Sequence, residues 1–148
     1  MAFQFPLESL LRFRQSLERQ QEILLQQANF QAAELRRMIA ALERAAGEIR
    51  ASNATDLRAG TCAAELHFNA LRLSMLAERR LKIEAALVQA EERCALRRQA
   101  LQHSRQQREI IDSLRKRQLH SYEDLQKKRE QRRLDDLFLL RRDFLRRG

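Results

Sequence analysis

Residues 52–61, Ser-Asn-Ala-Thr-Asp-Leu-Arg-Ala-Gly-Thr, hold the one cluster of turn-forming residues in this chain of 148 residues. Turns favour Gly, Pro, Asn and Asp, and a compact multi-layer domain needs several turns. The whole sequence has only three Gly and one Pro, so the economical interpretation is a single reversal of the chain. The sequence therefore predicts an all-α fold, an antiparallel two-helix coiled-coil hairpin with a longer C-terminal helix.

We expect one coiled-coil domain over residues 1–148. Its first helix is predicted at about 6–50, its turn at about 51–61 and its second helix at about 62–146. Pro6 suits a helix start because the first turn leaves its backbone N–H without a partner in any case. Ala, Leu, Glu, Gln and Arg dominate the composition and aromatic residues make up only 5%, which is typical of coiled coils.

Apolar residues recur in a heptad pattern on both sides of the turn, as a seam between paired helices requires. Before the turn, ten of thirteen seam positions are apolar: Leu7, Leu10, Leu17, Leu24, Ala28, Leu35, Met38, Leu42, Ala45 and Ile49. After it, the apolar seam positions are Leu66, Leu73, Leu76, Ile83, Leu87, Ala90, Cys94, Leu101, Ile111, Tyr122, Leu125 and Leu139. Later seam positions are increasingly interrupted by arginine, at Arg108, Arg115, Arg129 and Arg132.

The two predicted helices differ in length, about 65 Å for the first and about 125 Å for the second at 1.5 Å per residue. Matching residue 62 to residue 49 places residue 104 opposite residue 7. We therefore expect the chain from about residue 105 onward, roughly 60 Å of helix, to have no intramolecular partner. Its remaining apolar residues indicate a docking element, a frayed segment or a surface for self-association.

The net charge of +9 is unevenly distributed. Residues 1–60 carry 8 Lys and Arg against 7 Asp and Glu, whereas residues 61–148 carry 21 against 13. Such a basic excess promotes contact with nucleic acid, anionic lipid or an acidic protein surface, and does not choose among them.

We expect no enzyme activity, no catalytic residue, no cofactor and no metal site. His67, His103 and His120 are too far apart on one helix to surround one ion, and Cys62 and Cys94 form no Cys-x-x-Cys pair, so free thiols are expected. The carboxylates lie among Arg and Lys, as solvated ion pairs do. No apolar run approaches the roughly 18 residues that span a bilayer, and the N-terminus lacks a secretory pattern, so we expect a cytoplasmic location and no membrane insertion.

Three stretches of the sequence, in order, resemble the flagellar export protein family FliJ. Residues 1–15, Met-Ala-Phe-Gln-Phe-Pro-Leu-Glu-Ser-Leu-Leu-Arg-Phe-Arg-Gln, resemble that family's start, in which an aromatic pair precedes Leu-Leu and a long helix. Residues 56–60, Asp-Leu-Arg-Ala-Gly, resemble its hairpin connection. Tyr122 with residues 130–138, Glu-Gln-Arg-Arg-Leu-Asp-Asp-Leu-Phe, resembles its C-terminal pattern of Glu, a basic pair, an aliphatic residue and two acids.

The resemblance implies a non-enzymatic component of the flagellar type III export apparatus, similar to the central stalk subunit of rotary ATPases. It implies three partners: the hexameric export ATPase, whose ring the stalk enters and activates, the cytoplasmic domain of the export gate, and export chaperones that the protein escorts. It also implies a peripheral position at the cytoplasmic face of the inner membrane when the protein is bound to the apparatus.

By the same resemblance, the free ends, residues 3–17 and about 110–147, face the ATPase, and the half nearer the hairpin faces the gate. The expected ATPase-binding residues are Arg115, Arg117, Arg129, Arg132, Arg133, Leu134, Asp135 and Phe138. The expected gate-binding residues are Met38, Leu42, Ala45, Ile49 and Leu76. The family pattern has aromatic residues where this chain has Ala45 and Ile49, so an alternative stays open in which Leu42, Ile49 and Leu76 are seam residues buried within the hairpin.

Two other functions stay open. A self-associating structural coiled coil would pair the unpartnered segment between chains. A basic nucleic-acid-binding coiled coil would use the runs of Arg and Lys at 115–117, 127–129, 132–133, 141–142 and 146–147. These cations surround the helix among acids instead of lining one face, which favours an acidic protein surface over nucleic acid.

Overall fold

The computed structural model describes residues 2–148, which form two long helices and, in that range, no strand. Helix α1 runs over Glu8–Ala59 and helix α2 over Ala63–Arg147. The all-α prediction and the prediction of two helices packed against each other are confirmed, and α2 is the longer helix, as expected. The chain divides into two compact units, Arg19–Gln102 (the hairpin unit) and Met1–Glu18 with His103–Gly148 (the terminal unit). The assignment of all residues to one domain stays a prediction.

The turn lies later than the sequence predicted, because residues 51–59 are helical and only residues 60–62 connect the two helices. Gly60 ends α1 with φ +85°, the left-handed conformation that closes many helices and that only glycine adopts without strain. The prediction of a turn over about 51–61 was therefore wrong, apart from its last two residues.

The polar residues before Gly60 do not break the helix because their side chains bond within the fold. Thr55 Oγ1 donates a hydrogen bond to the carbonyl of Ala51, one helical turn earlier (3.1 Å). On α2, Asn69 Nδ2 donates to Asn53 Oδ1 across the seam (2.6 Å). The bond between Asn69 and Asn53 joins the two helices, and the bond from Thr55 gives its hydroxyl a partner inside the helix at a small cost in helix stability.

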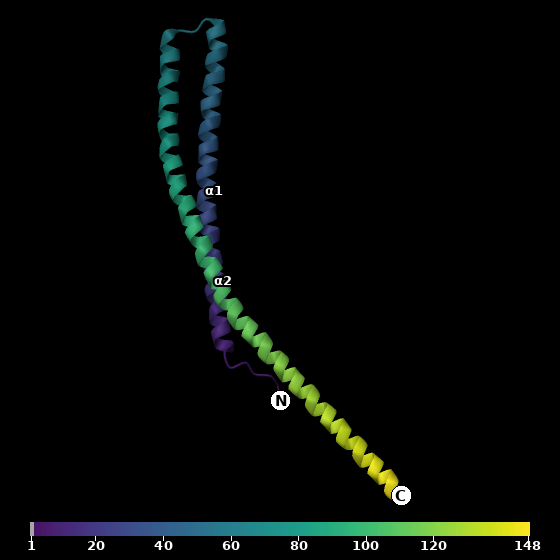
Figure 1. Cartoon of the computed structure of the whole chain (residues 1–148). Coiled ribbons are helices and arrows are strands. Elements are labelled where there is room, and N and C mark those ends of the chain that lie inside the picture. The colour runs from purple at the N-terminus through teal and green to yellow at the C-terminus, as the bar shows by residue number, and fades with distance from the viewer. Residues whose placement is uncertain (1) are drawn as a thin grey trace. The chain divides into compact units, whose positions relative to one another are not determined.

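Helices α1 and α2 run antiparallel and side by side through the hairpin unit (Figure 1). Its buried cluster consists of small side chains, Ala32 from α1 with Ala90 and Cys94 from α2. Ala28, Leu35 and Leu87 pack around that cluster. An ion pair between Arg36 Nη2 and Glu91 Oε1 (2.8 Å) crosses the two helices beside it. The hairpin unit is thus held by a narrow apolar seam with charged edges, as in a coiled coil.

The terminal unit has a separate apolar cluster of Phe5, Leu11 and Ile111, against which Phe3 packs. The Phe3 ring also contacts the Tyr122 ring, with centroids 5.6 Å apart. The aromatic residues before α1 therefore cover α2 and extend the paired region beyond the end of α1.

The expected alignment of the two arms was wrong. It placed residue 104 opposite residue 7 and left the chain from about residue 105 without a partner. In the structure Glu8 pairs with Arg115 (3.5 Å), and contacts to the N-terminal segment continue as far as Tyr122. The physical reason is the later, shorter turn, which moves every residue of α1 opposite a later residue of α2.

An unpaired end of α2 does exist, but it is shorter than expected. Every residue from Lys127 to Gly148 is exposed, and within the terminal unit the N-terminal segment does not lie beside the yellow end of α2 (Figure 1). We call Lys127–Arg147 the tail segment. At 1.5 Å per residue it is about 30 Å long, half of the roughly 60 Å expected.

Candidate docking surfaces

The tail segment presents charged groups that nothing else in the described chain neutralises. Residues 127–148 carry nine Lys and Arg against four Asp and Glu. Among residues 2–148, no ion pair involves a side chain of the tail segment; along α2 the nearest such contact joins His120 Nε2 and Asp124 Oδ2 and is an ion pair only when the histidine is protonated. These charges are therefore available to a partner without breaking any internal contact.

Apolar side chains are exposed along the same segment. Leu134 is 66% exposed, Phe138 67% and Phe144 81%. A monomeric helix with several Leu and Phe side chains in water is a candidate interaction site.

The structure separates the predicted ATPase-binding residues into two groups. Arg129, Arg132, Arg133, Leu134, Asp135 and Phe138 all lie in the tail segment and are exposed. Arg115 and Arg117 lie in the paired part of α2, where Arg115 contacts Glu8 and Arg117 lies beside Ile110 and Leu114 on a shallow surface. The structure therefore brings six of the eight residues together on one unpaired segment, and the assignment to the ATPase stays a prediction.

Two of the arginines at late seam positions, Arg108 and Arg115, have acidic partners from α1, which the heptad pattern alone did not reveal. Glu18, whose side chain is only 13% exposed, forms ion pairs with two arginines of α2. Its Oε1 lies 3.4 Å from Arg105 Nε, and its Oε2 pairs with Arg108 Nε. The hydrogen bond that Arg108 donates to Glu18 raises the pKa of its guanidinium. Arg108 is therefore a structural cation of the terminal unit, held by a half-buried carboxylate.

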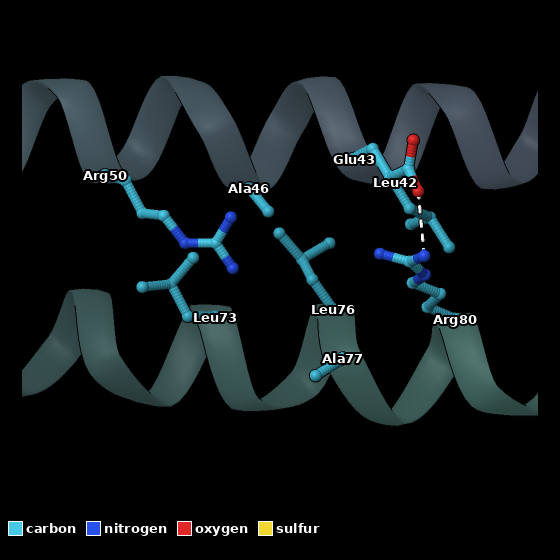
Figure 2. A pocket seen from close by; sticks show the side chains of 8 residues that line it. All are labelled: Leu42, Glu43, Ala46, Arg50, Leu73, Leu76, Ala77 and Arg80. Carbon is cyan, nitrogen blue, oxygen red and sulfur yellow. Dashed lines mark ion pairs between the residues drawn. The ribbon is translucent and has the colours of Figure 1, made fainter.

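A second candidate surface is a groove of about 300 Å³ between the two helices of the hairpin unit. Leu42 and Ala46 from α1 and Leu73 and Leu76 from α2 line it, and their side chains point toward one another in Figure 2.

Charged side chains stand at both ends of this groove. At one end Arg80 Nη2 pairs with Glu43 Oε1 (2.8 Å), which Figure 2 draws as a dashed line. The hydrogen bond from Arg80 to Glu84, with the charge of Glu43, raises the pKa of Arg80. At the other end the guanidinium of Arg50 lies over Leu73, and Arg50 has no ion-pair partner among residues 2–148. The groove thus offers an apolar floor and one uncommitted cation.

The predicted gate-binding residues lie mostly along the seam. Ile49 is buried, Leu42, Ala45 and Leu76 are half-buried, and only Met38 is exposed. This burial fits the alternative in which Leu42, Ile49 and Leu76 serve the hairpin's own packing. As a binding set, these five residues do not form one exposed patch, and their role at the gate stays a prediction.

Sequence reasoning missed an apolar stripe on the outer face of α2. Phe68, Leu71 and Met75 are 61%, 53% and 70% exposed, and the guanidinium of Arg72 lies 5.9 Å from the centre of the Phe68 ring. Spacings of three and four residues place them on one helix face. The signal was present in the sequence as apolar residues left over after the seam positions were assigned.

No three His, Cys, Asp or Glu side chains converge on a common point anywhere in residues 2–148. Within that same range neither helix is long and apolar enough to cross a membrane. Cys62 and Cys94 are both free thiols, the first exposed and the second buried.

A family model described as the flagellar FliJ protein matches residues 3–148 of this chain. No curated protein and no solved structure matches it.

Proposed function

Since this chain belongs to the FliJ family of flagellar proteins and is a component of the flagellar export apparatus, we propose that it acts there as a non-enzymatic stalk. Its tail segment engages the ring of the export ATPase, and its hairpin unit contacts the cytoplasmic domain of the export gate. The protein works in the cytoplasm and is held at the inner membrane through the apparatus.

The observation that carries this proposal is the unpaired, basic and apolar tail segment at the end of a continuous helix. A stalk needs a packed body with a projecting end that fits inside a ring. The terminal unit supplies such an end, because its apolar cluster reaches Ile111, its last inter-segment ring contact is at Tyr122 and everything from Lys127 is exposed. Uncommitted Arg and Lys side chains suit a partner surface of negative potential.

Removing charge from the tail segment tests the ATPase assignment. The variant R129Q/R132Q/R133Q removes three uncommitted cations, and R79Q/R93Q/R98Q removes three exposed cations of the hairpin unit as a matched control. Stimulation of purified export ATPase should require on the order of tenfold more of the tail variant, since each exposed pair contributes up to about 1 kcal/mol. The control should stimulate like the wild type. Equal stimulation by both variants would reject the tail segment as the engaging element.

The gate contact is proposed for the hairpin unit, where exposed apolar residues of α2 are available without opening the seam. Phe68, Leu71 and Met75 meet that condition, whereas Ile49 is reached only by separating the helices. We expect F68S/M75S to weaken binding to the purified cytoplasmic domain of the gate, and F30S/L96S, which changes two equally exposed apolar residues of the same unit, to leave it unchanged. Weakening by I49S alone would favour the seam residues instead.

Escort of export chaperones belongs to the same proposal and rests on family membership alone. The competing function, a self-associating structural coiled coil, is favoured by the bare Leu and Phe side chains of the tail segment, which a second copy would cover. Sedimentation velocity over a wide concentration range separates the two functions. A stalk stays monomeric, whereas a structural coiled coil forms larger species that the change F138S/F144S abolishes.

A further inference from the structure

The tail segment carries one continuous apolar face. Consecutive helical residues are about 100° apart around the axis, which places six apolar residues of 134–145 within a sector of about 160°. These are Leu134, Leu137, Phe138, Leu140, Phe144 and Leu145, and each is at least 62% exposed. The face is about three helical turns long, and no described residue of the terminal unit covers it.

The aspartates and two of the arginines lie on different sides of this face, while Lys128, Arg132, Arg142 and Arg146 lie as far from its middle as the aspartates do. On the same wheel Arg141 lies inside the apolar sector and Arg133 lies near its edge. All three aspartates, Asp135, Asp136 and Asp143, lie about 120° or more from its middle. When the apolar face is turned down onto a surface, the three aspartates therefore point away from that surface and these two cations stay close to it, whereas Glu130, one helical turn before Leu134, lies in line with the face.

We propose that the tail segment binds the surface of an anionic phospholipid bilayer as an interfacial helix. The Leu and Phe side chains enter the boundary between headgroups and acyl chains, and the excess of Arg and Lys is attracted to the lipid phosphates. Arg141 can remain on the apolar face because its long side chain reaches back to the headgroups while its methylene groups stay among the lipids. The proposal concerns direct contact with lipid and does not rest on the proposed role at the ATPase.

Charge complementarity allows a bilayer surface or a nucleic acid, and the apolar face selects the bilayer surface between these two polyanions. A nucleic acid would neutralise the Arg and Lys but would leave the Leu and Phe face in water, since phosphate contacts carry that kind of binding. A bilayer surface covers the apolar face and at the same time attracts the Arg and Lys side chains. The helix lies on the bilayer and does not cross it, consistent with the lack of a membrane-spanning helix in residues 2–148.

Flotation of the full chain with lipid vesicles tests the proposal. Vesicles of phosphatidylglycerol mixed with phosphatidylcholine should bind the chain on the order of tenfold or more tightly than vesicles of phosphatidylcholine alone. The variant F138S/F144S keeps every charge and removes two rings of the apolar face, so it should bind the mixed vesicles on the order of tenfold less tightly. The matched control F30S/F68S removes two exposed rings of the hairpin unit and should bind like the wild type. Circular dichroism of both variants should give the helix content of the wild type.

Three results would overturn the proposal. Equal binding to both kinds of vesicle would remove the role of lipid charge. Wild-type vesicle binding by F138S/F144S would show that the net charge of the protein acts alone and that the apolar face stays in water. Duplex DNA binding that F138S/F144S abolishes, together with vesicle binding that it leaves intact, would assign the face to nucleic acid.

Discussion

The change Leu11→Ala should lower the free energy of unfolding of the terminal unit by about 2–3 kcal/mol. Leu11 is 1% exposed and belongs to the cluster with Phe5 and Ile111. The change removes three carbon atoms, worth about 0.8 kcal/mol each in transfer from water. Because the cluster has three buried side chains with Phe3 packed against them, neighbouring side chains can close part of the cavity, which keeps the loss near the lower end of the range for buried leucine.

The adjacent residue provides the control. Leu10 is 38% exposed and lies outside the buried cluster, so Leu10→Ala should cost about 1 kcal/mol or less. Native-state hydrogen exchange is the appropriate assay, because two compact units can open separately and a single unfolding curve would average them. Amides of residues 8–18 should lose protection in Leu11→Ala and keep it in Leu10→Ala. Equal losses in the two variants would refute the assignment of this cluster as the core of the terminal unit.

Three further changes test other parts of the fold. Glu18→Gln removes the carboxylate that holds two arginines. The free energy of unfolding, measured by urea titration, should fall by about 1–3 kcal/mol, a loss between those of exposed and buried ion pairs. A loss below about 0.3 kcal/mol would show that the contact contributes little to stability. Gly60→Ala should destabilise the chain by about 1 kcal/mol because of its positive φ, whereas Gly47→Ala, in open space within α1, should stabilise it by up to about 1 kcal/mol. A thiol reagent should modify Cys62 quickly and Cys94 only after unfolding, as their exposure requires, and comparable rates at both would contradict the packing of the hairpin seam.

The class of fold was readable from the sequence because helix breakers are so few. One Pro and three Gly in 148 residues allow few ways to end a helix, and Leu at heptad spacing defines which face of each helix is covered. These features depend on local sequence, so a single chain is sufficient to interpret them. The separate helices and the longer C-terminal one followed from them.

The position of the turn could not be read with the same accuracy. Ser, Asn, Thr and Asp favour turns on average, but here Thr55 bonds to its own helix and Asn53 bonds across the seam to Asn69. Gly60 alone ends α1. Whether a polar residue finds a partner inside a helix depends on tertiary contacts, which the residue type does not specify.

The alignment of the two arms was the larger error, and it has a related cause. A heptad pattern specifies a face and leaves the partner's offset undetermined, since shifting one helix by whole heptads preserves the seam. The offset was therefore set by the misplaced turn. In the correct register Arg108 and Arg115 meet Glu18 and Glu8, so two arginines of the segment that was expected to be unpaired belong to the paired one.

The candidate surfaces were predicted to different degrees. Six of the expected ATPase residues share the exposed tail segment because they are close in sequence, whereas Arg115 and Arg117 lie beside paired chain. The gate set was chosen by its distance from the hairpin, and distance along a helix does not distinguish a seam position such as Ile49 from an outer position such as Met75. A position on the outer face can be recognised only after the register of the two helices is known.

Truncation after Gln126 tests the central claim most directly, that the unpaired end of α2 engages the export ATPase. The shortened chain keeps the intramolecular ion pairs and ring contacts, up to Tyr122 and Asp124, so it should keep a helical, cooperatively unfolding structure. ATP hydrolysis by the purified export ATPase is measured with the full chain and with the shortened one. We predict that the shortened chain fails to stimulate hydrolysis at any concentration at which the full chain does. Full stimulation by a folded chain of residues 1–126 would contradict the account.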